Sequence, residues 1–156
     1  MFMRPWSRCV LLLALTFLAR PAAAASVIEP LAFYSWRDDP GVGSLGVGAA
    51  IGFASFDVVP MFEYVFVDDS SDWALTVDGH LPVMALPVVA FYVGAGITAY
   101  QHNPDQGDSD SDVGGNFLLG AKASIRRLKP FVEFKYTTQG EGGLVFTLGT
   151  RFHLGD

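Results

Sequence analysis

The sequence is poor in cysteine and in charge, and both shortages limit what the protein can be. Its only cysteine is Cys9. Charged residues make up 17% of the 156 residues, whereas a typical soluble domain has about 25%. The 16 Asp and Glu residues outnumber the 10 Lys and Arg residues, which is the wrong sign of charge for a nucleic-acid partner. A single cysteine excludes a disulfide scaffold, and the composition disfavours a disordered chain, a charged coiled coil and a nucleic-acid-binding protein.

The apolar run that opens the chain is too short to span a membrane as a helix. This run, Cys9–Ala19, falls below the ~20 residues that a spanning helix needs. Arginines precede it and the alanines 22–25 follow it, which is the layout of a secretory signal peptide; Pro21 argues against an uncleaved anchor. We therefore predict a signal peptide over residues 1–25, secretion by the Sec pathway, and one domain over residues 26–156 that contains no thiol and no cofactor.

Along most of the remaining chain, apolar residues alternate with small or polar residues with a period of two. Most of its eight apparent strands have about ten or more residues, against ~5–6 in a typical globular strand. The predicted strands are Val27–Trp36, Gly43–Ala54, Ser55–Val67, Trp73–Val83, Pro87–Tyr100, Gly115–Arg126, Pro130–Thr138 and Gly143–Leu154. Strands of this length cross a bilayer when tilted, and an even number of them fits an up-and-down barrel.

The two faces of these strands differ in polarity. In the last strand Leu144, Phe146 and Leu148 share one face, while Gly149 and Arg151 share the other. A soluble barrel turns its apolar face inward and covers the outside with many charges, but the mixed face here carries only one or two charges per strand. We therefore predict an all-β fold, an eight-stranded antiparallel up-and-down transmembrane β-barrel with its apolar face in lipid.

The segment Gly115–Leu154 is the most characteristic part of the chain. A glycine-rich strand, a basic turn, the strand Pro130–Tyr136 and a closing strand that contains Leu148-Gly-Thr-Arg-Phe152 follow one another. In this the chain resembles the small eight-stranded outer-membrane barrels of Gram-negative bacteria, the group of the outer-membrane protein A transmembrane domain and the opacity-type proteins. The resemblance implies an outer-membrane monomer that is inserted by the barrel-assembly machinery and contacts outer-membrane lipid and lipopolysaccharide.

Charged residues collect on the face that we expect to point inward. They are Glu63, Asp78, His80, Lys122, Glu133, Lys135 and Arg151. Each needs a partner, because an unpaired charge in a narrow lumen costs several kcal/mol in lost hydration. Glu133 and Lys135 share a face of one strand, and Lys122 lies across the hairpin from them, so we expect Lys135 to neutralise Glu133 or another inward carboxylate. Glu63 and Asp78 lie together across another hairpin and would repel each other unless a cation from the far wall reaches them. The predicted ion-pair network would plug the lumen; the alternative is a very narrow, gated, porin-like pore.

The segment Asp105–Gly115 is acidic and has the D-x-D-x-D spacing of a calcium loop. The match fails further on, since Val113 stands where the motif requires glycine and Leu119 where it requires glutamate. Asp108, Asp110 and Asp112 are thus weak metal candidates. We expect an extended, solvated loop without a metal, the alternative being a loosely held divalent cation that bridges to lipopolysaccharide phosphates.

The motifs are architectural and indicate a non-catalytic protein with a structural or surface-interaction role. The alternative is a lipid-modifying enzyme of the lipid A deacylase or acyltransferase type, which uses a histidine, a serine and an acid. The chain has three histidines, and none forms a His-x-Ser pair on a lipid-facing strand. We expect His102 to be an ordinary polar residue of the third outer loop. An adhesin would usually have longer loops.

Overall fold

The computed structural model describes residues 27–38, 41–68, 70–104, 107–139 and 142–154. The predicted signal peptide, residues 1–25, lies outside the described residues. In the part of the chain that is described, no helix is both long enough and apolar enough to cross a membrane.

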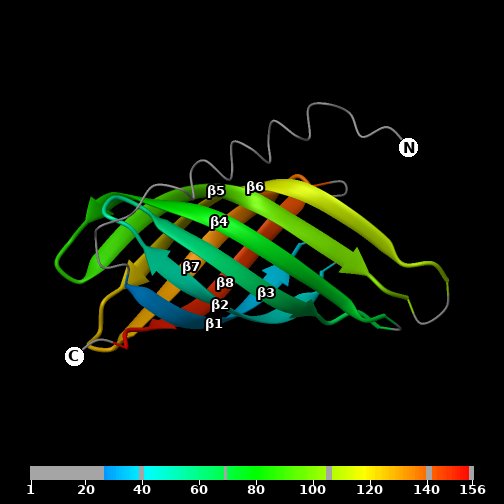
Figure 1. The fold of residues 1–156 in the computed structure, drawn as a ribbon, viewed down its shortest axis with the longest axis horizontal. Helices are drawn as coiled ribbons and strands as arrows, with labels where there is room; N and C mark the ends of the chain where they lie inside the picture. The colour runs from blue at the N-terminus through cyan, green and yellow to red at the C-terminus, as the bar shows by residue number, and fades with distance from the viewer. Residues whose placement is uncertain (1–26, 39–40, 69, 105–106, 140–141, 155–156) are drawn as a thin grey trace.

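The chain forms a closed antiparallel β-barrel in which each strand pairs with the next and β8 pairs with β1 (Figure 1). The strands are β1 (Ile28–Arg37), β2 (Gly43–Gly52), β3 (Asp57–Val65), β4 (Asp72–Ala85), β5 (Val89–His102), β6 (Asp110–Ala123), β7 (Leu128–Thr137) and β8 (Gly143–Phe152). The predicted fold class is therefore confirmed. Turns of three or four residues follow β2, β4 and β6 at one end of the barrel, where β8 also ends, and longer connections lie at the other. We name these the inner end and the outer end, because short turns face the periplasm in such barrels.

The alternation of residues predicted from the sequence corresponds to side chains that point alternately into the barrel and outward from it. On β1, Leu31 and Phe33 are buried while Tyr34 and Trp36 are about half exposed. Large apolar side chains point outward in the same way on every strand. A continuous apolar exterior of this extent cannot stay dispersed in water, so the barrel faces lipid and the soluble alternative is excluded.

The lumen is narrow because large side chains fill it. Its glycines have no side chain, which leaves room for the side chains of the neighbouring strands. A Cβ atom on Gly46 would lie 2.1 Å from the ring of Phe33, and one on Gly96 would lie 2.1 Å from Oδ1 of Asp78. Toward the inner end, apolar side chains also fill the interior, and Leu31, Phe33, Val59, Met61 and Phe131 pack there with Ala50. The interior is thus a packed core that includes charged groups.

The main departure from the predicted strands concerns the start of β6. The sequence pattern places it at Gly115, but β6 begins at Asp110, where Asp110 pairs with His102 and Asp112 with Tyr100. β4, β5 and β6 each have 14 residues, so these three strands are longer than the other strands of the barrel (Figure 1). Half of the predicted acidic loop is therefore strand.

Candidate functional site

Ion pairs cross the lumen between strands that are not neighbours in the sheet. From the outer end inward, Arg37 of β1 pairs with Glu63 of β3, Lys135 of β7 pairs with Asp78 of β4, and Arg151 of β8 pairs with Asp57 of β3. We name these the outer, middle and inner layers. Each layer ties opposite or separated walls of the barrel together.

The outer layer joins three strands. The Arg37 guanidinium donates to Oε1 of Glu63, and the Ser44 hydroxyl donates to Oε2 of the same carboxylate at 2.9 Å. Both charged side chains are nearly buried. The two carboxylate oxygens of Glu63 are therefore satisfied from β1 and β2.

The middle layer lies around Asp78, whose side chain has no exposure to solvent. Lys135 Nζ lies 2.5 Å from Asp78 Oδ2, and Asn116 Nδ2 donates to Asp78 Oδ1 at 3.1 Å. Asn116 also donates to the Thr98 hydroxyl. Of the inward carboxylates expected as its partner, Lys135 pairs with Asp78 rather than with Glu133 of its own strand, so a cation from another wall reaches Asp78.

The inner layer combines ion pairs with an aromatic stack. Arg151 is 1% exposed; its Nη1 donates to Asp57 Oδ2 at 2.8 Å and its Nη2 to His80 Nδ1 at 2.9 Å. Tyr92 stacks on His80 with ring centroids 4.8 Å apart and donates its hydroxyl to Glu133 at 2.7 Å. Side chains from both halves of the barrel therefore meet in this layer.

Lys122 completes this layer, and a further pair lies closer to the inner end. Lys122 Nζ lies 3.2 Å from Asp57 Oδ2, so Asp57 accepts from two cations. Glu29 accepts from Lys129 and lies 2.9 Å from Nδ1 of His153. The seven charged residues singled out from the sequence all lie on the inward face. Four further charged residues at or near strand ends also point inward, and each continues the period-two pattern of its strand, although none was predicted: Glu29, Arg37, Asp57 and Lys129.

A small cavity separates the outer layer from the middle layer. Its volume is about 20 Å³, and it is bordered by Arg37 and Glu63 on one side and by Asn116 and Lys135 on the other. Such a volume holds about one water molecule. The described interior therefore has a polar chamber but no wide channel at this level.

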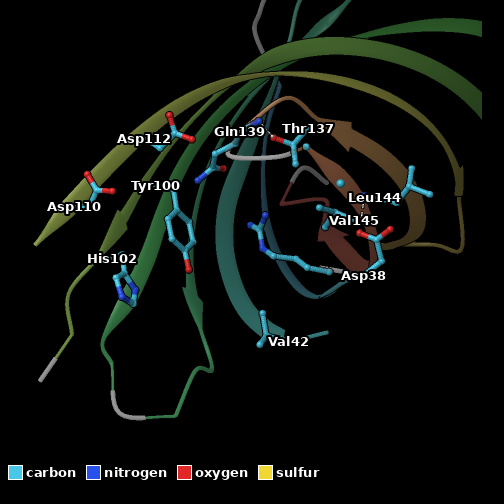
Figure 2. Close-up of a pocket in the computed structure, with 13 residues that line it drawn as sticks. Asp38, Val42, Tyr100, His102, Asp110, Asp112, Thr137, Gln139, Leu144 and Val145 are labelled. Carbon is cyan, nitrogen blue, oxygen red and sulfur yellow. Dashed lines mark hydrogen bonds between the residues drawn. The ribbon is translucent and has the colours of Figure 1, made fainter. Parts of the chain in front are cut away.

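A larger pocket of about 410 Å³ opens at the outer end (Figure 2). Tyr100, His102, Asp110 and Asp112 form its wall on β5 and β6, and Thr137, Gln139, Leu144 and Val145 lie opposite, with Arg37, Asp38, Val42, Gly142 and Gly143. We name it the outer pocket. His102 belongs to β5 rather than to a loop, so that expectation was wrong.

A buried carboxylate beside the pocket positions two of its residues. Asp72 accepts a hydrogen bond from the Tyr100 hydroxyl at 2.5 Å and lies 2.8 Å from Nδ1 of His102. Asp72 is buried, whereas the His102 side chain is 44% exposed. The histidine is therefore oriented through Nδ1. Among the described residues, no serine forms a hydrogen bond with a histidine.

The acidic residues near this pocket do not gather into a calcium loop. Asp108 is exposed in the connection before β6, and Asp105 lies outside the described residues. Asp110 Oδ1 accepts from the backbone N–H of Ser111 at 2.9 Å, and Asp112 Oδ1 from that of Val113 at 2.8 Å. No group of three or more metal-ligating side chains is found in the described part of the chain. These aspartates instead satisfy backbone donors of an exposed strand.

Comparison with known proteins identifies the fold and little else. No family model matches the chain, and no curated protein matches it either. The chain is similar to the N-terminal β-barrel domain of OprF from Pseudomonas aeruginosa, with a TM-score of 0.68, 16% identity and coverage of 80% of this chain and 95% of that one. Neisserial surface protein A gives a TM-score of 0.65 at 11% identity, covering 83% and 97%.

A third similar structure is Ail, the attachment invasion locus protein of Yersinia pestis, in complex with the heparin analogue sucrose octasulfate. It gives a TM-score of 0.57 at 14% identity, covering 81% and 97%. The resemblance drawn from the sequence is confirmed in the fold. A closed barrel of this type with an apolar exterior is an outer-membrane protein, so the expected location is confirmed as well.

Proposed function

We propose that the protein is a non-catalytic outer-membrane barrel that is closed by its ion-pair network and acts at the cell surface through its outer end. The observation that carries the proposal is that all three layers join separated strands across the lumen. A conducting path would have to part these charges. Removing the partner of a buried charge costs about 3–5 kcal/mol, so the paired, closed arrangement is strongly favoured.

Conductance separates a closed barrel from a gated narrow pore. Purified protein in a planar lipid bilayer should produce no current steps at physiological salt, because each layer fills the lumen with paired side chains. The double variant Arg37→Ala, Lys135→Ala removes the outer and middle layers but keeps the inner layer and the apolar core, so it should also produce no current steps. Its migration on a detergent gel without boiling reports whether it is still folded. Regular current steps from the unaltered protein would refute the closed lumen.

One observation keeps an enzyme as a second candidate. His102 is oriented by buried Asp72 and lines the outer pocket, an arrangement that general-base histidines share. Mass spectrometry of lipid A from cells that do or do not make the protein tests this directly. We expect identical spectra. A loss or gain of acyl chains that disappears in His102→Gln would establish the lipid-modifying alternative.

We also propose that the chain reaches this location as a secreted precursor. Residues 1–25 would be removed as a signal peptide after Sec-dependent secretion, and the barrel-assembly machinery would insert the remainder as a monomer among lipid and lipopolysaccharide. Sequencing the N-terminus of the protein isolated from outer membranes should begin at Ser26. Recovery of the intact Met1 terminus would favour the uncleaved anchor.

The charge of the outer end bears on the class of surface partner. The structure of Ail contains a polyanion, whereas the outer pocket here carries Asp38, Asp110 and Asp112 at its border. Like charges oppose such binding. We therefore propose that a surface partner of this protein is not a polyanionic glycan.

A further inference from the structure

We infer that the outer pocket binds a cationic group on an aliphatic stem, the chemistry of a lysine or arginine side chain in a basic peptide segment. The inference deepens the surface role proposed above and rests on it. It depends on three properties of the pocket: its charge, its acceptors and its apolar lining.

The charge of the lining is negative on two sides. Asp110 and Asp112 stand on the β6 wall, and Asp38 stands across the pocket from them (Figure 2). Among the described lining residues, Arg37 alone carries a fixed positive charge, and its guanidinium is paired with Glu63. The lining therefore carries three carboxylates and a single fixed cation, which is paired with Glu63.

Acceptors in the pocket remain available for a donor-rich ligand. The Oε1 atom of Gln139 is shielded from solvent and has no hydrogen-bond partner in the structure. Such an unpaired acceptor is costly, and rotation of the Gln139 amide into the pocket would let a ligand N–H satisfy it. On the opposite wall, Asp110 accepts from the Ser111 backbone through Oδ1, and a carboxylate has about four acceptor sites. Guanidinium and ammonium groups consist of donors only, so they complement this lining.

The remaining lining suits the stem that carries the charge. Val42, Leu144 and Val145 supply apolar surface, and the Tyr100 ring already has the Arg37 guanidinium 5.9 Å from its centroid. Long basic side chains bury their methylene stems against such surface and keep their charge near acceptors or aromatic rings. A volume of about 410 Å³ admits one side chain with its backbone and not a folded domain.

Binding can be measured with small probes that carry this chemistry. Purified barrel in octyl glucoside, a neutral detergent, is titrated with Nα-acetyl-arginine amide and agmatine by NMR, with Nα-acetyl-glutamate amide as a probe of similar size and opposite charge. We expect saturable binding of both cationic probes, with shifts centred on Tyr100 and Gln139, and no binding of the glutamate probe. Absence of saturable binding by the cationic probes would overturn the inference.

Matched variants decide whether the pocket or the general negative charge is responsible. Asp110→Asn with Asp112→Asn should weaken binding at least about tenfold, since the β6 wall of the pocket loses both of its negative charges. Asp108→Asn removes a charge from the neighbouring connection, outside the pocket lining, and should leave binding unchanged. Both variants lie on exposed positions, and unboiled gel migration checks that each barrel is folded. The inference would be overturned if Asp108→Asn weakened binding as much, per charge removed, as the double variant does.

Two further outcomes are distinct. Displacement of the cationic probes by an equal concentration of calcium would overturn the inference in favour of a divalent-cation site. Current steps from the unaltered barrel would refute the closed lumen while leaving probe binding intact, whereas a closed barrel that ignores the probes would refute only the inference.

Discussion

Lys135 can be replaced by methionine, which has a similar length and no charge. Among the residues that the structure describes, its ammonium group is the only cation paired with Asp78, whose side chain is wholly buried. After Lys135→Met, Asp78 retains only the hydrogen bond from Asn116. Breaking a buried pair in this way costs about 3–5 kcal/mol, which lowers the folded-to-unfolded ratio by about two to three and a half orders of magnitude.

Two further variants separate the ion pair from general damage to the core. Asp78→Asn combined with Lys135→Met removes both charges, so most of the lost stability should return. Lys129→Met removes a lysine nearer the inner end, where Glu29 retains His153 as a partner; it should cost less than Lys135→Met. The comparison therefore isolates the cost of leaving one charge alone in the lumen.

Urea titration of the barrel in detergent micelles, followed by tryptophan fluorescence and by gel migration, measures these free energies. We expect Lys129→Met and the double variant each to lower the free energy of unfolding by less than Lys135→Met alone does. A Lys135→Met barrel as stable as the unaltered one would refute the cross-lumen pair. So would a double variant that is less stable than Lys135→Met.

Three other predictions follow from the geometry. Gly96→Ala should cost about 1–3 kcal/mol in a urea titration, because its Cβ would meet Asp78 and the Val77 carbonyl, whereas Gly79→Ala has only one contact, at 3.7 Å, and should be tolerated; equal effects would contradict the packing. A short epitope inserted after Asp108 should leave the barrel folded and be accessible to antibody on intact cells, whereas the same insertion after Asn116 should prevent folding. Asp72→Asn should loosen Tyr100 and His102 and speed protease cleavage between β5 and β6 without changing the stability of the barrel, and unchanged cleavage would show that Asp72 does not order this wall.

The fold could be read from the sequence where apolar alternation is complete. β2 and β8 begin where the pattern places them, because Leu45 and Leu144 start an apolar face at once. The start of β6 could not be read in this way. Asp110, Ser111 and Asp112 carry no apolar alternation, and their strand conformation depends on pairing with β5. The local sequence of these residues therefore does not predict a strand, because the strand forms through hydrogen bonds with β5.

The lumen shows the same limit at the level of single contacts. Period two was enough to assign Asp78 and Lys135 to the inward face, but it does not say which charges meet. Glu133 and Lys135 are neighbours on one face of β7, so sequence proximity favours that pair. The tilt of the strands instead sets Lys135 level with Asp78, while Glu133 accepts from Tyr92. Partner choice therefore depends on the shear of the closed barrel.

The layers have a consequence for how the barrel can be assembled, because their charges are divided between the two halves of the chain. In the lumen, β1–β4 contribute the acids Glu29, Asp57, Glu63 and Asp78 with Arg37 as a cation, and β5–β8 contribute the cations Lys122, Lys129, Lys135 and Arg151 with Glu133 as an acid. Neither half can neutralise itself. Before closure, β1–β4 would expose an excess of negative charge and β5–β8 an excess of positive charge. Burying either half alone in lipid is unfavourable, and the two halves attract each other. Closure of the barrel by pairing of β8 with β1 brings the two sets of charges together and neutralises both.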